Sequence, residues 1–134
     1  MSPSAATRAV WVALAVGALS STGWAAENGD ALARLAPAFG NTIVSTHPDG
    51  RKARLWLDAG GTYAAQGRAG NRSSGTWKTK GDKLCLTQRS PLPIPFPYCT
   101  AIPAERVGKP WRDKAVNGDA VTNVIMKGAK DANR

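Results

Sequence analysis

From residue 42 onward, short stretches of β-prone residues alternate with turns rich in glycine, asparagine and aspartate. The clearest stretch is 52–58, where Ala53, Leu55 and Leu57 occupy every second position between charged or aromatic residues. A period of two predicts a strand that turns one face toward the core. By the same pattern we expect strands over 42–46, 52–58, 62–66, 73–80, 83–88, 97–102, 107–116 and 120–127.

Turn signals separate these segments at intervals of about ten residues. Asp49-Gly50 and Gly60-Gly61 are typical turn pairs, and Asn117-Gly118 is a strong hairpin signal. No alternation of strands with long helices appears. The pattern predicts an all-β fold, a small antiparallel up-and-down meander of about eight strands that closes into a barrel or a curled sheet.

The segments that flank the β-domain lack its pattern of short β-prone stretches and turns. Residues 26–40 predict a leader with a short helix, in which Asp30 caps the start, Leu32 and Leu35 share a face, and Pro37 limits the length. The single β-domain is expected over residues 41–127. Residues 128–134 contain no large apolar side chain and predict a disordered tail.

The first 25 residues have the pattern of a secretory signal peptide. Arg8 precedes an apolar run over 9–19, which is shorter than the roughly 20 residues of a membrane-spanning helix. The small residues Gly23 and Ala25 fit a cleavage site after Ala25. We therefore predict a periplasmic or secreted protein that has no membrane span after signal cleavage.

The chain has two cysteines, Cys85 and Cys99, and in an exported protein a disulfide between them is the expected state. The segment that they enclose, CLTQRSPLPIPFPYC, carries a proline at every second position over 91–97. We call residues 91–97 the proline loop. Because proline cannot serve in a central strand, this segment predicts a stiff connection between two strands that the disulfide holds together.

Three apolar residues, Leu92, Ile94 and Phe96, alternate with these prolines. The favoured interpretation is that they fold over one end of the barrel and cover its core as a lid. The alternative is a rigid, pre-ordered binding loop, which would lose little entropy on binding a partner.

Charge gives a second candidate surface. The formal net charge is +9, and removal of the predicted signal peptide leaves 17 basic and nine acidic residues. Such an excess favours attraction to anions, although a solvated basic surface without a specific partner gives the same composition. The alternation places Trp56 on the outer strand face with Lys52 and Arg54. The candidate anion- or partner-binding residues are Arg51, Lys52, Arg54, Trp56, Arg68, Arg72, Lys78, Lys80 and Lys83.

Few residues offer catalytic or metal-binding chemistry. The single histidine, His47, precedes Asp49 in a predicted turn, where such a pair is a turn motif before it is part of a catalytic triad. One histidine and two bridged cysteines do not supply a structural metal site, and no phosphate-binding loop is present. The carboxylates fall mostly in predicted turns or helix caps. We therefore expect no enzyme, no metal and no cofactor.

The stretches GNTIVSTHPDGR, LDAGGTY and SSGTWKTKGDKLCL carry a resemblance. Over roughly residues 40–100 they resemble small exported β-sheet proteins of Gram-negative bacteria, most of them uncharacterised, with a G-x-T, D-G and G-x-W…G-D-x-L-C pattern. In architecture alone the chain is also similar to the periplasmic inhibitors of secreted metalloproteases, which are small eight-stranded barrels with a signal peptide and one disulfide. No inhibitory motif can be matched residue by residue.

Three functional hypotheses follow. The first is a non-enzymatic exported binding or inhibitor-like module that uses the basic face or the proline loop, with an acidic protein or an anionic envelope polymer as its partner. The second is a barrel that binds nucleic acid or another anionic polymer, with Trp56 stacking on it. The third is a small hydrolase, against which the lack of histidines and of a carboxylate pair argues.

Overall fold

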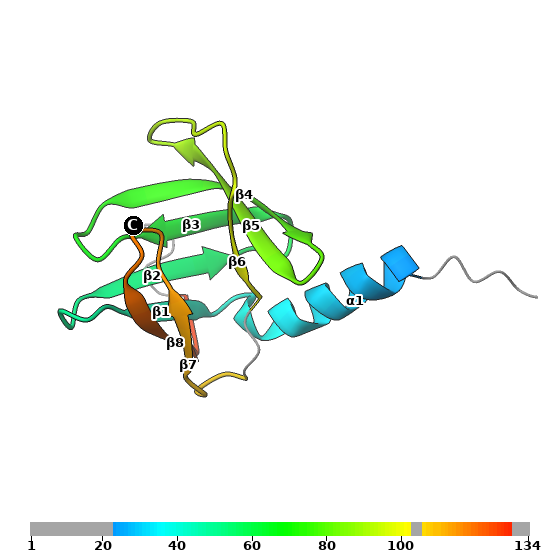
Figure 1. The fold of residues 1–134 in the computed structure, drawn as a ribbon, viewed down its shortest axis with the longest axis horizontal. Helices are drawn as coiled ribbons and strands as arrows, with labels where there is room; N and C mark the ends of the chain where they lie inside the picture. Colours follow the sequence, from blue (N-terminus) through cyan, green and yellow to red (C-terminus); the bar gives the residue numbers. More distant parts are fainter. Residues whose placement is uncertain (1–22, 103–105, 130–134) are drawn as a thin grey trace, which may run out of the picture.

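The computed structural model describes residues 23–102 and 106–129. Within these residues the predicted all-β fold is confirmed: an eight-stranded antiparallel sheet curls into a nearly closed barrel, with a helix at one end (Figure 1). Residues 1–22 of the predicted signal peptide and 130–134 of the predicted tail lie outside the described residues. The elements are α1 (Gly23–Leu35), η1 (Ala36–Ala38), β1 (Thr42–Thr46), β2 (Lys52–Leu57), β3 (Thr62–Gln66), β4 (Arg72–Lys80), β5 (Lys83–Ser90), β6 (Tyr98–Ala101), β7 (Trp111–Lys114) and β8 (Ala120–Met126).

The strands follow the predicted meander, in the order β6-β5-β4-β3-β2-β1-β8-β7. Cross-strand pairs such as Ile43 with Leu55, and Leu55 with Ala65, place the apolar residues of the alternating pattern in rows on the inner face. β7 is shorter than predicted, because residues 107–110 form a turn and an extended segment before Trp111.

One end of the barrel is closed by the helix. Ala31 and Leu35, one turn apart on α1, are buried against inner-face residues that include Leu84 and Ile125. The predicted short helix is therefore confirmed, but two details were wrong. Asp30 lies inside α1 rather than at its start, and Leu32 is 45% exposed, because the buried face follows the spacing of four residues.

The edge strands β6 and β7 are joined by side chains. The Thr100 Oγ1 donates a hydrogen bond of 3.0 Å to the Asp113 Oδ2, and the Tyr98 hydroxyl donates one of 3.1 Å to the Lys114 carbonyl. Among the described strands, β6 and β7 share no backbone ladder. We call the line where β6 and β7 meet the seam of the barrel, and these two hydrogen bonds link the strands across it.

The end opposite the helix is open. Three turns lie around it: 47–51 between β1 and β2, 67–71 between β3 and β4, and 115–119 between β7 and β8. Behind them lies a cavity of about 450 Å³ that opens to this end of the barrel. The helix and the cavity thus occupy opposite ends of the barrel.

The chain after β8 turns back onto the sheet. The Thr42 Oγ1 donates a hydrogen bond of 2.6 Å to the Gly128 carbonyl, and the Gly128 amide donates one of 3.0 Å to the Asn41 Oδ1. The first residue of the predicted tail is therefore fixed by hydrogen bonds, contrary to the prediction of disorder for Gly128. No helix within the described residues is both long enough and apolar enough to cross a bilayer.

Candidate functional site

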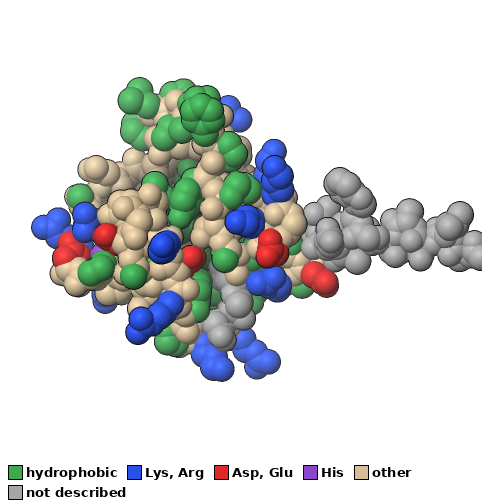
Figure 2. Space-filling view, in the orientation of Figure 1, with side chains coloured by type: hydrophobic (Ala, Val, Ile, Leu, Met, Phe, Trp, Pro, Cys, Tyr) green, Lys and Arg blue, Asp and Glu red, His purple; other side chains and the backbone are tan. Residues whose placement is uncertain are grey.

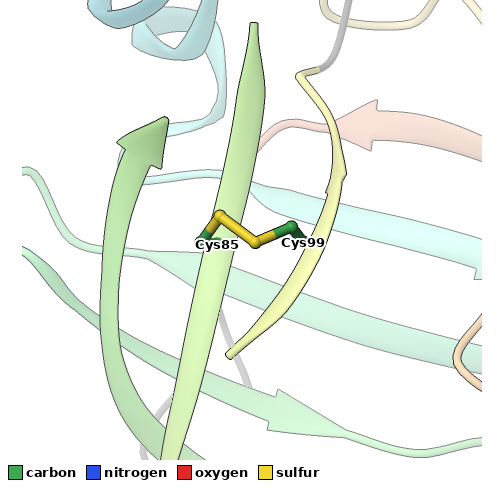
Figure 3. The surroundings of a disulfide bond; sticks show 2 residues. All are labelled: Cys85 and Cys99. Atoms are coloured by element: carbon green, nitrogen blue, oxygen red, sulfur yellow. A yellow bond between two sulfur atoms is a disulfide. The ribbon is translucent and has the colours of Figure 1, made fainter. Parts of the chain in front are cut away.

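The proline loop leaves the barrel between two strands that a disulfide joins. Cys85 on β5 and Cys99 on β6 are direct cross-strand partners, with their Cα atoms 4.0 Å apart, and their sulfur atoms are bonded (Figure 3). The predicted disulfide is present. As predicted, Cys85 points away from the face that carries Leu84 and Leu86, so the disulfide lies on the outer side of the sheet.

The hairpin that leads to the loop is bent at a glycine. The β4–β5 register shifts between Ser74 and Gly75, where a β-bulge interrupts the ladder. A Cβ atom on Gly75 would overlap the carbonyl oxygen of Thr87 and would come within 3.0 Å of the Tyr63 ring. Only glycine lets the two strands cross this closely. Beyond the bulge β5 continues to Ser90, two residues farther than predicted.

The proline loop stands away from the barrel. Leu92 is 72% exposed, Ile94 43% and Phe96 76%, and apolar side chains form the protrusion at the top of Figure 2. The interpretation of this loop as a lid over the core is wrong, because the outward bend of the β4–β5 hairpin carries the loop to the side. The core is closed by α1 instead.

The loop is held in shape by Gln88 at its base. The Ile94 amide donates a hydrogen bond of 3.0 Å to the Gln88 carbonyl, and the Gln88 Nε2 donates one of 3.0 Å to the Leu92 carbonyl. Four prolines fix further backbone dihedrals over these seven residues. The apolar side chains are therefore presented on a backbone that is already ordered.

The candidate basic residues do not form one surface. Arg51 and Arg68 lie in the turns at the open end, where both pair with Asp49, at 3.8 and 3.0 Å. Arg68 also lies 3.5 Å from Asp119. These two arginines are thus engaged by carboxylates. Lys78, Lys80 and Lys83 lie toward the opposite end, around the β4–β5 turn.

A smaller group of basic residues lies on the outer face of β2 to β4. The register aligns Arg54, Gln66 and Arg72 in one cross-strand row, with Lys52 two residues before Arg54. Lys52 is exposed and Arg54 is half-buried, and among the described residues neither forms an ion pair. We call Lys52, Arg54 and Arg72 the outer basic group.

Trp56 lies beside this group but is not available to a partner. The alternation places it on the outer face as predicted, yet only 5% of the residue is exposed. Its Nε1 donates a hydrogen bond of 2.8 Å to the Thr42 Oγ1, and the Arg72 guanidinium lies 5.5 Å from the centre of its ring. The expectation of an exposed stacking residue is therefore wrong, since these contacts bury the indole.

His47 pairs with a distant carboxylate rather than with Asp49. Its Nδ1 lies 3.1 Å from the Asp119 Oδ2, across 72 positions of sequence. The hydrogen bond from His47, followed by that from the Asn117 amide and the charge of Arg68, lowers the pKa of Asp119. Among the described residues no serine, threonine or cysteine is hydrogen-bonded to His47. The pair therefore joins two turns at the open end of the barrel.

Asp113 was not predicted as a site residue from the sequence, because the carboxylates fall mostly in predicted turns or helix caps. It lies on β7, on the same face as Trp111, and both residues line the cavity. The signal was present, because Trp111 and Asp113 are two positions apart in a segment predicted to be a strand. What the pattern does not reveal is the hydrogen bond from Thr100 across the seam.

Comparison of the chain with protein-family models, with curated protein sequences and with solved structures finds no match. The resemblance to small exported proteins of Gram-negative bacteria, and the architectural likeness to metalloprotease inhibitors, therefore stay predictions. The candidate site rests on this chain's own geometry.

Proposed function

We propose that this protein is a non-enzymatic binding module that acts outside the cytoplasm and docks onto a partner protein through its proline loop. The observation that carries the proposal is the exposure of Leu92 and Phe96 at 72% and 76%. Apolar side chains gathered on one protrusion are typical of interaction sites. The predicted signal peptide and the disulfide support an oxidising compartment.

The architecture of the loop suits binding by insertion. A stiff backbone loses little conformational entropy on docking, so more of the apolar burial contributes to affinity. Phe96 is the expected anchor, because aromatic residues in a desolvated pocket dominate many interfaces. The partner would then present a concave apolar pocket, as an enzyme does to an inhibitor loop.

Capture from a periplasmic extract tests this function. The wild-type protein is compared with Leu92→Ser/Phe96→Ser and with the control Leu32→Ser/Met126→Ser, which removes two exposed apolar side chains elsewhere. We expect the wild type and the control to retain the same protein and the loop variant to lose it. Retention by the loop variant, or equal loss in both variants, contradicts the proposal.

The outer basic group favours a second candidate function, binding of an anionic polymer. Arg54 and Arg72 lie two strands apart in one row, about 10 Å from each other. Binding of heparin or DNA in a salt series tests it. A loss of heparin or DNA binding in Lys52→Gln/Arg54→Gln, but not in the control Lys109→Gln/Lys127→Gln, which removes the same charge, supports specific binding at the outer basic group. Equal losses indicate an effect of net charge alone.

A further inference from the structure

The cavity at the open end of the barrel is the strongest feature that the proline loop does not explain. Its volume of about 450 Å³ lies within the range of pockets that enclose small organic ligands. Most of its wall is apolar and is formed by inner-face side chains such as Ile43, Leu55 and Leu86. Because the surrounding turns leave this end open, a ligand could enter without unfolding any strand.

Among the described strands, one charged side chain, that of Asp113, lies on the inner face. Asp113 follows Trp111 by two positions on β7, pairs across the sheet with the buried Val121, and lines the cavity. Its carboxylate accepts two hydrogen bonds, from the Thr100 Oγ1 at 3.0 Å and from the Lys114 amide at 2.8 Å. A carboxylate offers about four acceptor positions, so two remain for a ligand.

No cation of the described chain neutralises this carboxylate: among residues 23–102 and 106–129, Asp113 forms no ion pair. Arg68 also lines the cavity but is held by Asp49 and Asp119. Arg54 lines it too, but its side chain starts from the outer face of β2, because Leu55 is on the inner face. Lys114 follows Asp113 directly, so its side chain starts from the opposite face of β7, and it is exposed. Within the described part of the chain, the inner wall therefore presents a carboxylate that forms no ion pair.

Aromatic rings lie close to the carboxylate. Trp111 is on the same face of β7, and Tyr98 lines the cavity from β6, across the seam. Burial raises the pKa of Tyr98, a hydrogen bond with Thr100 lowers it by a smaller amount, and the negative charge of Asp113 adds a further small increase, which is consistent with the proximity of the two residues. The faces of such rings attract ammonium groups, especially where water is partly excluded.

We propose that the cavity binds a small molecule with an apolar body and a single ammonium group, the ammonium pairing with Asp113 beside Trp111 and Tyr98. The apolar body would lie against the aliphatic inner wall. This inference is independent of the proline loop, because the two features lie on different parts of the barrel and share no residue.

Three probes with the same apolar body test the charge preference: 4-phenylbutylamine, 4-phenylbutanol and 4-phenylbutyrate, measured by isothermal titration calorimetry at pH 7. A charge-assisted hydrogen bond predicts that the amine binds about tenfold more tightly than the alcohol. The carboxylate should bind least. A preference for the carboxylate, equal affinities, or no binding of the amine overturns the proposal.

Variants locate the site. Asp113→Asn keeps an acceptor oxygen and the shape of the side chain but removes the negative charge. The affinity of the amine should therefore fall to within about threefold of the affinity of the alcohol. The control Asp82→Asn removes an exposed carboxylate at the other end of the barrel and should leave the affinities of all three probes unchanged. Ser73→Leu, which fills the cavity from β4, should weaken all three probes. The probe comparison uses the wild type, so it remains decisive even if Asp113→Asn does not fold.

Discussion

Gly75 on β4 packs directly against the backbone of Thr87 on β5, with no room for a Cβ atom between them. This contact lies at the bulge where the β4–β5 register shifts. It allows the hairpin to bend outward and carry the proline loop to the side of the barrel. The geometry of the candidate binding loop therefore depends on one glycine inside a strand.

Gly75→Ala should therefore destabilise the fold, because the added methyl group meets backbone rather than a movable side chain. We expect a loss of about 3 kcal/mol in the free energy of unfolding, measured by urea denaturation. Gly70→Ala is no suitable control, since Gly70 has a positive φ. Ser74→Ala changes the neighbouring residue without crowding, and should cost less than about 1 kcal/mol. Equal losses would contradict the role of the bulge.

Trp56 should be a stability residue. Its indole is buried and donates a hydrogen bond to the Thr42 Oγ1, so Trp56→Ala should lower the free energy of unfolding by about 3–5 kcal/mol. Trp56→Phe removes the hydrogen bond and keeps most of the ring, and should cost less. A stable Trp56→Ala protein with weakened heparin binding would instead support the exposed stacking role that the structure contradicts.

The Cys85–Cys99 disulfide closes the strands at the base of the proline loop. Replacement of both cysteines by serine should lower the free energy of unfolding by about 3 kcal/mol, because the unfolded chain regains the freedom of this loop. The mature protein should also contain no titratable thiol under non-reducing denaturing conditions. Two free thiols in protein purified from the periplasm would refute the disulfide.

The lowered pKa of Asp119 predicts a dependence of stability on pH. A carboxyl group whose pKa is lower in the folded state stabilises the fold above its unfolded pKa, about 3.8 here. That contribution is lost as the pH falls through the lower folded value. The free energies of unfolding of the wild type and Asp119→Asn should therefore differ most at and above pH ~4 and converge in stronger acid. A difference that stays constant over this acid range would contradict the His47–Asp119 link as its cause.

Local sequence patterns were enough to predict most of the barrel. The limits of β1 and β3 agree with the predicted strands, because turn residues flank both short β-prone segments. The disulfide also followed from local evidence, since Cys85 and Cys99 are the only cysteines and lie in neighbouring strands.

The features that could not be predicted from the sequence depend on contacts between residues far apart in the chain. Trp56 is buried by Thr42 and Arg72, which lie 14 and 16 positions away, so the period of two alone predicts an exposed ring. The His47–Asp119 pair and the Thr100–Asp113 bond likewise join strands and turns that meet only when the barrel closes. The direction of the proline loop depends on a bulge that appears in the sequence only as a glycine within a strand.

Site-specific photo-crosslinking can detect contact between the proline loop and a partner protein inside the cell. Benzoylphenylalanine is incorporated in place of Phe96, and in a control in place of Leu32, an exposed apolar residue on α1. Both proteins are expressed with export to the periplasm and irradiated in intact cells. If the proline loop docks onto a partner, we expect one discrete protein adduct from position 96 and none from position 32. No adduct at position 96, or the same adducts from both positions, would contradict it.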